Sequence, residues 1–285
     1  MNPPKALFAA FSLCALLLAY TCDPDDLDNQ LPEEHFDNEA QVKQAVDSIY
    51  TILRTDGLYK ETFFYSMDFM SLEQMNTSDP LYHIFLQFTF DASTNYIADY
   101  WKECYVGIRL ANRVISNEET INQIPDAIIS QERKAKYIGE AQFLRAFYYF
   151  LLVTRFGDVP LNLDYAANLK GLPRTSKSEI WAQIEEDLIS AAGKCLPKNL
   201  EEKGRITSGA AWALLGKAHL FQANESNNQA DFIAAKNAFL NVIEDVANYD
   251  LEDVYSDNFK EETENGSESI FEVEFNDIEG TYRPW

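Results

Sequence analysis

The sequence is poor in cysteine and histidine and has no nucleotide-binding glycine motif. Four cysteines in 285 residues are too few for a disulfide framework. The three histidines, His35, His83 and His219, show no metal-ligand spacing with one another or with the cysteines. No glycine-rich phosphate loop and no Gly-x-Ser-x-Gly nucleophile motif occurs. We therefore expect no cofactor, no metal site and no serine-hydrolase chemistry.

Basic residues are also scarce. The chain has 23 Lys and Arg against 46 Asp and Glu, a formal net charge of -23. Such a surface repels phosphate backbones, which argues against a nucleic-acid partner. Aromatic residues, in contrast, are abundant, with 15 Tyr, 19 Phe and 4 Trp. The composition is that of a folded protein whose length is ample for a substantial core.

The N-terminus has the pattern of a targeting segment. An apolar stretch from Ala6 to Ala19 follows Lys5 and has the length of a signal peptide rather than a membrane span. It leads to Cys22 and resembles a bacterial lipoprotein signal, in which that cysteine becomes the acylated first residue. An ordinary secretory peptide with an incidental cysteine is the alternative. We predict a signal over residues 1–21, an acidic tether over 22–36 and a folded domain over 37–285.

One stretch, IGEAQFLRAFYYFLLVTRFGDVPL at residues 138–161, organises the rest. It is apolar around most of a helical circumference, so the helix must be surrounded by protein. Gly157 and Pro160 then end it. The sequence predicts a central buried helix whose apolar spine, including Phe147 and Leu151, is covered by other helices.

Two of the charged residues within this apolar helix call for a partner. An unpaired buried Arg145 would cost several kcal/mol, so we expect a carboxylate partner and a structural role, and Asp187 could supply it. Glu140 raises the same question on the apolar side of the helix.

Further helical periodicity predicts an all-α fold of tetratricopeptide-like helical pairs with long irregular loops. Trp212, Leu215, Gly216 and His219 have the spacing of the first helix of such a unit. Alternation over residues 269–275 predicts a minor β segment near the C-terminus. The predicted helices span residues 37–55, 94–115, 128–156, 180–196, 210–222 and 233–246.

Several stretches resemble the SusD/RagB family of Bacteroidetes outer-membrane lipoproteins. They are WKECYVGIRLAN (101–112), GEAQFLRAFYY (139–149), FGDVPL (156–161), RTSKSEIW (174–181), GRITSGAA (204–211) and ESIFE (268–272). The resemblance implies a surface-exposed, lipid-anchored protein that binds a glycan or other nutrient. It also implies a partner, a TonB-dependent SusC-like transporter, and a role in oligosaccharide import. Members of the family continue well beyond the length of this chain, so it looks like the N-terminal part of such a protein.

Residues 59–95 match the ligand-facing region of that family by position only. We expect a short helix around residues 62–75 followed by a long loop, a type of segment that is commonly functional. Aromatic rings and amide or carboxylate groups suit sugar recognition, while local loop packing is the alternative. The candidate ligand-binding residues are Asn76, Asp79, Tyr82 and Phe85.

Two other classes of function remain open from the sequence. Helical repeats often bind peptides, so a protein-interaction scaffold without its own small-molecule ligand is one alternative. A glycoside hydrolase is the other, but nothing singles out a pair of catalytic carboxylates. We therefore predict a binding protein and not an enzyme.

Overall fold

The computed structural model describes residues 36–71, 80–167, 171–245 and 247–275, with the backbone alone for 62–66 and 80–82. These residues form α-helices and short 3-10 helices. Within the described ranges, the β contact is a single isolated bridge between Val159 and Thr175. The predicted signal and Cys22 lie outside the described residues. Phe36, at the end of the predicted tether, is 2% exposed and belongs to the core.

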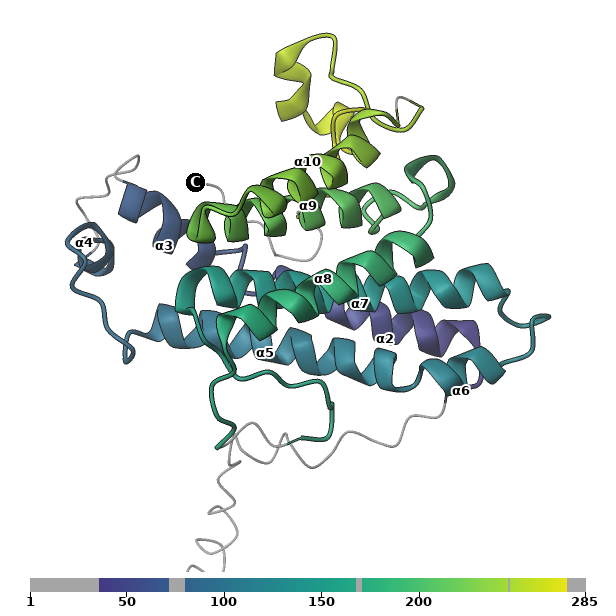
Figure 1. Ribbon diagram of the computed structural model, residues 1–285, viewed down its shortest axis with the longest axis horizontal. Coiled ribbons are helices and arrows are strands. Elements are labelled where there is room, and N and C mark those ends of the chain that lie inside the picture. The colour runs from purple at the N-terminus through teal and green to yellow at the C-terminus, as the bar shows by residue number, and fades with distance from the viewer. Residues whose placement is uncertain (1–35, 72–79, 168–170, 246, 276–285) are drawn as a thin grey trace, which may run out of the picture. The chain divides into compact units, whose positions relative to one another are not determined.

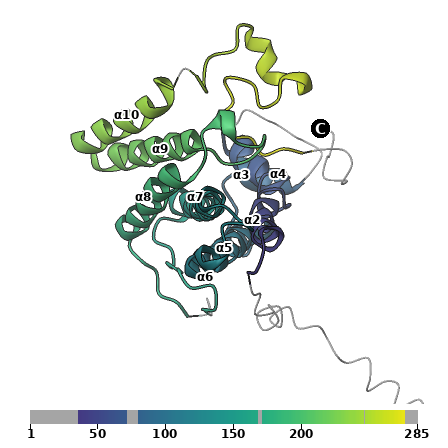
Figure 2. The same cartoon turned by 90° about the vertical axis from the view of Figure 1, so that its right-hand side faces the viewer.

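Helix α7 (Gln131–Phe156) is the central element, and most of its residues are buried. It packs against α5 (Asn95–Ser116) and α2 (Glu39–Leu53), and separately against α8 (Lys177–Lys194). The succession is visible in Figure 1 and, with several helices seen nearly end-on, in Figure 2. Leu151 is buried, while Phe147 is partly buried and stacks on Phe143. The predicted buried helix is therefore confirmed.

Local sequence signals set most helix boundaries. The side chains of Asn38 and Thr207 accept hydrogen bonds from the backbone of the first helical turns that follow them. Ser176 and Glu179 form the reciprocal capping box that their spacing predicts. At the other end of α7, Gly157 has φ +71°, a conformation that glycine adopts without steric cost. The predicted starts and stops thus follow from side chains adjacent in sequence.

Helices α9 (Ser208–Ser226) and α10 (Gln229–Ile243) form the next pair, with α9 also packing on α8. Their close approach depends on Gly216, because a Cβ atom there would lie 2.6 Å from the ring of Phe239. This is the role expected of small residues in stacked helical pairs. The tetratricopeptide-like architecture is confirmed.

The region between α2 and α5 differs from the expectation. It contains α3 (Thr62–Ser71) and then a second helix, α4 (Pro80–Leu86), where the sequence predicted a loop. Proline fits the first position of a helix, because its missing N–H has no helical acceptor there. Pro80 was therefore a start signal rather than a loop signal. The short α6 (Glu118–Gln123) connects α5 to α7.

The predicted β segment at residues 269–275 does not form a strand in the described part of the chain. Among the described residues no neighbouring strand supplies hydrogen-bond partners, and the alternation reflects burial instead. Phe271 and Val273 pack against the core. Short 3-10 helices at Lys198–Leu200, Tyr255–Phe259 and Glu261–Thr263 complete the described elements. No helix in the described ranges is long and apolar enough to cross a membrane.

The partner predicted for Arg145 is also confirmed. Its Nε donates to Asp187 Oδ2 at 2.8 Å and its Nη2 donates to Asp187 Oδ1 at 2.6 Å. The third nitrogen donates to Asn112 Oδ1 at 2.9 Å, and Asn112 in turn donates to the backbone oxygen of Asn162. One buried guanidinium therefore joins α5, α7, α8 and the segment that follows α7.

Candidate functional site

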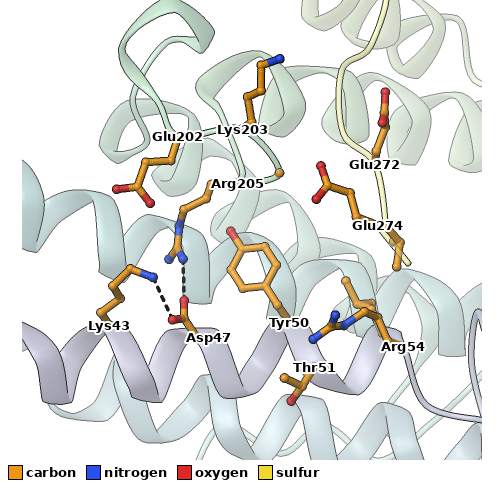
Figure 3. Close-up of a pocket in the computed structure, with 13 residues that line it drawn as sticks. Lys43, Asp47, Tyr50, Thr51, Arg54, Glu202, Lys203, Arg205, Glu272 and Glu274 are labelled. Atoms are coloured by element: carbon orange, nitrogen blue, oxygen red, sulfur yellow. Dashed lines mark hydrogen bonds and ion pairs between the residues drawn. The ribbon is translucent and has the colours of Figure 1, made fainter. Parts of the chain in front are cut away.

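A cavity of about 380 Å³ lies between α2, the α8–α9 connection and the C-terminal segment (Figure 3). A neighbouring cavity of about 220 Å³ shares part of the same connection and extends to Lys198 and Phe271. The three walls come from parts of the chain that are far apart in sequence. The larger cavity is lined by Lys43, Asp47, Tyr50, Thr51, Leu53, Arg54, Glu202, Lys203, Gly204, Arg205, Glu272, Val273 and Glu274.

The lining of the larger cavity is balanced in charge, although the whole chain is strongly acidic. It includes Lys and Arg side chains, an equal number of Asp and Glu side chains, and the hydroxyls of Tyr50 and Thr51. The lining therefore offers both donors and acceptors, and its formal charges cancel. Such a lining suits a neutral ligand rich in hydroxyl groups better than an anion or a cation.

Arg205 lines both cavities and connects two helices. Its Nε donates to Glu140 Oε2 at 2.9 Å, and its Nη1 donates to Asp47 Oδ1 at 2.5 Å. The guanidinium also lies over the ring of Tyr50, 5.1 Å from the centroid. Lys43 pairs with the same Asp47 at 2.9 Å, and Figure 3 shows both cations directed at that carboxylate. The arrangement fixes the cavity wall on α2 relative to α7.

Glu140 is the buried anion of this group and is fully inaccessible to solvent. Its Oε2 accepts from the Tyr50 hydroxyl at 2.5 Å as well as from Arg205. Burial raises the pKa of Glu140 to about 7, and the attraction of Arg205 opposes that rise. The same burial raises the pKa of Tyr50 well above its ordinary value, so this phenol stays a hydrogen-bond donor.

Glu140→Gln should remove a pH dependence of folding stability. The folded-state pKa of about 7 lies above the ordinary value of 4.5, so the folded chain holds the proton more tightly. The stabilisation from this group is complete below the unfolded pKa and is lost as the pH rises through the folded pKa. As the pH rises from below 4.5 to above 7, the free energy of unfolding of the wild type should fall by on the order of 3 kcal/mol relative to that of the variant. Urea unfolding of both chains across the window tests this, and parallel pH profiles would contradict it.

The structure places two of the four predicted ligand-binding residues, Tyr82 and Phe85, on α4. Asn76 and Asp79 lie outside the described residues, and Tyr82 belongs to α4 with only its backbone described. Phe85 is fully buried, with ring centroids 5.3 Å from Phe90 and 6.0 Å from Tyr96. A ligand could reach the Phe85 ring only if this segment moved. Phe85 lines neither cavity.

Sequence reasoning did not single out Asp47, Tyr50 or Arg205 as site residues. The sequence did contain a signal for this site, because Glu140 is a charged residue on the apolar side of the central helix. The argument that required a partner for Arg145 requires a cation for Glu140 as well. The choice of Arg205, 65 residues further along the chain, depends on the tertiary fold. Among the described residues, no group of His, Cys, Asp and Glu is arranged to hold a metal ion.

Residues 25–220 match the SusD-like family described as "Starch-binding associating with outer membrane". A SusD-like protein, P25, from Formosa agariphila is 27% identical over 266 residues, which cover 88% of this chain and 48% of that protein. The structure superposes on a SusD homologue from Bacteroides thetaiotaomicron with a TM-score of 0.74 at 21% identity, covering 89% and 49% of the two chains.

A second solved structure, titled a laminarin-binding SusD-like protein, gives a TM-score of 0.67 at 25% identity. The alignment covers 83% of this chain and 51% of that protein. The chain therefore spans about half the length of the relatives that it matches.

Proposed function

Because the chain belongs to the SusD-like family of starch-binding proteins that associate with the outer membrane, we propose that it binds an oligosaccharide at the cell surface. Bound glycan would then pass to a TonB-dependent SusC-like transporter for import. The observation that carries the proposal is the family match, which extends over most of the helical scaffold. This chain spans about half the length of its relatives, and we propose the activity for the whole protein.

Two surfaces could contribute ligand contacts in this proposal. The segment between α3 and α5 carries Asn76, Asp79, Tyr82 and Phe85, and we retain these residues as candidate contacts. The larger cavity supplies donors and acceptors of both signs, which suit sugar hydroxyls. Neither surface needs a catalytic group, and we propose a binding protein rather than an enzyme.

Titration calorimetry with laminarin and starch oligosaccharides tests the proposed binding. The laminarin-binding structural relative and the family description motivate these two probes. We expect saturable binding of at least one of them. Failure of both to bind would overturn the proposal. Release of shorter sugars during prolonged incubation would overturn its non-catalytic part.

The transporter partnership has a separate test. Mild detergent extraction of the producing cells, followed by purification of this chain, should recover a TonB-dependent transporter in stoichiometric amount. Recovery of the chain without a transporter would contradict the partnership and would leave the glycan-binding proposal intact.

Cys22→Ser should release the protein from the membrane pellet into the supernatant. Acyl chains on Cys22 would supply about 0.8 kcal/mol of membrane affinity per buried CH₂ group. A chain with a net charge of -23 has no electrostatic attraction to an anionic membrane surface that could replace them. Cell fractionation and immunoblotting measure the change.

Cys14→Ser is the matched control, because Cys14 lies within the predicted signal over residues 1–21. We expect this variant to fractionate as the wild type does. Retention of Cys22→Ser in the membrane pellet would show that another part of the protein anchors it.

A further inference from the structure

Helix α4 ends in a hydrogen-bond pattern that normally calls for glycine. The backbone N–H of Phe88 donates to the carbonyl of Phe85 at 3.2 Å, and that of Thr89 donates to the carbonyl of Ile84 at 2.9 Å. This pair of bonds places the second residue after the helix in the left-handed conformation, where glycine or asparagine is usual. Phe88 occupies that position with φ +54°.

A bulky side chain in this conformation is unusual within the same protein. The other non-glycine residues with positive φ in the described ranges are Asn227 and Asn265. Asparagine tolerates the left-handed region, whereas a Cβ-bearing aromatic residue pays a steric penalty there. Such strain persists where the surrounding structure or a function maintains it. Packing does not explain Phe88, because its side chain is 61% exposed.

The ring is nevertheless held in place from beneath. Phe88 contacts Phe90 with ring centroids 6.5 Å apart, and Phe90 contacts the fully buried Phe85 at 5.3 Å. Phe85 also contacts Tyr96 near the start of α5. A chain of aromatic contacts therefore connects the exposed ring to α5. This support lowers the conformational entropy that the ring would lose on binding a ligand.

Polar residues lie next to Phe88 in the sequence. Gln87 and Thr89 flank it in sequence and are exposed. Asp91 is exposed too, and its Oδ1 accepts hydrogen bonds from the backbone and hydroxyl of Ser93 at 2.8 Å and 2.6 Å. An exposed aromatic residue in a segment that also carries an exposed amide, hydroxyl and carboxylate has the groups that recognise a sugar, which has an apolar ring face bordered by hydroxyls.

We propose that Phe88 is a ligand-binding residue on which a pyranose ring of the oligosaccharide stacks. The strained backbone at the end of α4 turns the ring outward, and the underlying aromatic contacts hold it in that orientation. This inference rests on the proposed glycan-binding function and assigns a residue to it. The bulky side chain is then retained for binding at the expense of folding stability.

A structural role for Phe88 makes the opposite prediction for stability. If the ring contributed mainly to packing, Phe88→Gly would destabilise the chain. If the ring serves a ligand, glycine relieves the strain, and the folding equilibrium constant should rise by about fivefold. Urea unfolding without ligand separates the two roles.

Binding is measured with laminarin and starch oligosaccharides on the complete chain. We expect Phe88→Gly to weaken the affinity by about tenfold or more, because it removes the ring face. Phe88→Tyr keeps that face and should retain the wild-type affinity within about twofold. Tyr255→Ala is the matched control, because Tyr255 is 78% exposed and lies in an ordinary 3-10 helix outside this segment.

The outcomes distinguish the inference from the proposed function. If the wild type bound a probe and Phe88→Gly bound it with the same affinity, the inference would be overturned and the proposed function would stand. An equal loss in Tyr255→Ala, or a destabilised Phe88→Gly, would also overturn the inference. If the wild type bound neither laminarin nor starch oligosaccharides, the proposed function and the inference would both be overturned.

Discussion

Asp187→Ala should destabilise the chain by about 3–5 kcal/mol, because it leaves a buried guanidinium without its carboxylate. Arg145 is 6% exposed and Asp187 is 1% exposed, so water cannot replace the lost partner. Two nitrogen atoms of Arg145 donate to the two carboxylate oxygens, and both bonds disappear in the variant. The free energy of unfolding is measured by urea titration followed by circular dichroism.

Two comparisons isolate the cause of this loss. The exposed Asp56 pairs with Lys60 at 3.0 Å, and Asp56→Ala should cost no more than about 1 kcal/mol, as surface ion pairs usually do. The double variant Arg145→Met with Asp187→Leu removes both charges and should recover much of the stability. Equal losses in Asp187→Ala and Asp56→Ala would contradict the buried role of the pair.

Gly107→Ala and Gly193→Ala should change stability in opposite directions, although each adds one methyl group to a helix. A Cβ on Gly107 would lie 2.3 Å from a ring carbon of Tyr148. That ring is fully buried, and its hydroxyl donates to the backbone oxygen of Ile49 at 2.7 Å. A Cβ on Gly193 would meet nothing within 4 Å.

Magnitudes decide the sign at each position. Replacing glycine with alanine in a helix gains up to about 1 kcal/mol, and at Gly193, in the last turn of α8, no steric clash opposes that gain. Overpacking a core costs about 1–3 kcal/mol or more, and the short contact at Gly107 places it at the upper end. We therefore expect the two variants to differ by about 3 kcal/mol in urea unfolding. Equal stabilisation by both would show that Tyr148 can move aside without cost.

The helices were predictable because their signals lie within a few residues of one another. Ser176 and Glu179 bond reciprocally across a single turn, and this geometry requires no tertiary contact. The apolar circumference of α7 likewise required burial, whatever covers it. The need to neutralise Arg145 follows from the same local reasoning.

The prediction errors have equally specific causes. Pro80 begins α4, although the loop-forming residues that precede it favour a loop at this point of the sequence. The alternation at residues 269–275 distinguishes inward from outward side chains, but a strand also needs a hydrogen-bonding neighbour. Phe271 instead packs edge-on against Phe143 on the central helix, with ring centroids 5.7 Å apart.

The candidate cavity could not be derived from any one segment. Asp47 lies on α2 and Arg205 on the α8–α9 connection, 158 residues later, and these two residues form a hydrogen bond in the cavity lining. The conformation of Phe88 is a similar case, because its φ depends on how α4 ends.

Sequence alone determined the long helices, which of their faces are buried and which family the chain resembles, because capping and apolar periodicity act over a few residues. Tertiary structure decided that Arg205 neutralises Glu140, that the cavity lies between α2 and the C-terminal segment, and that Phe88 is exposed. These features depend on which distant surfaces meet. The sequence shows that Glu140 needs a cation, but the identity of that cation and the residues that line the cavity follow only from the packing of segments distant in the chain.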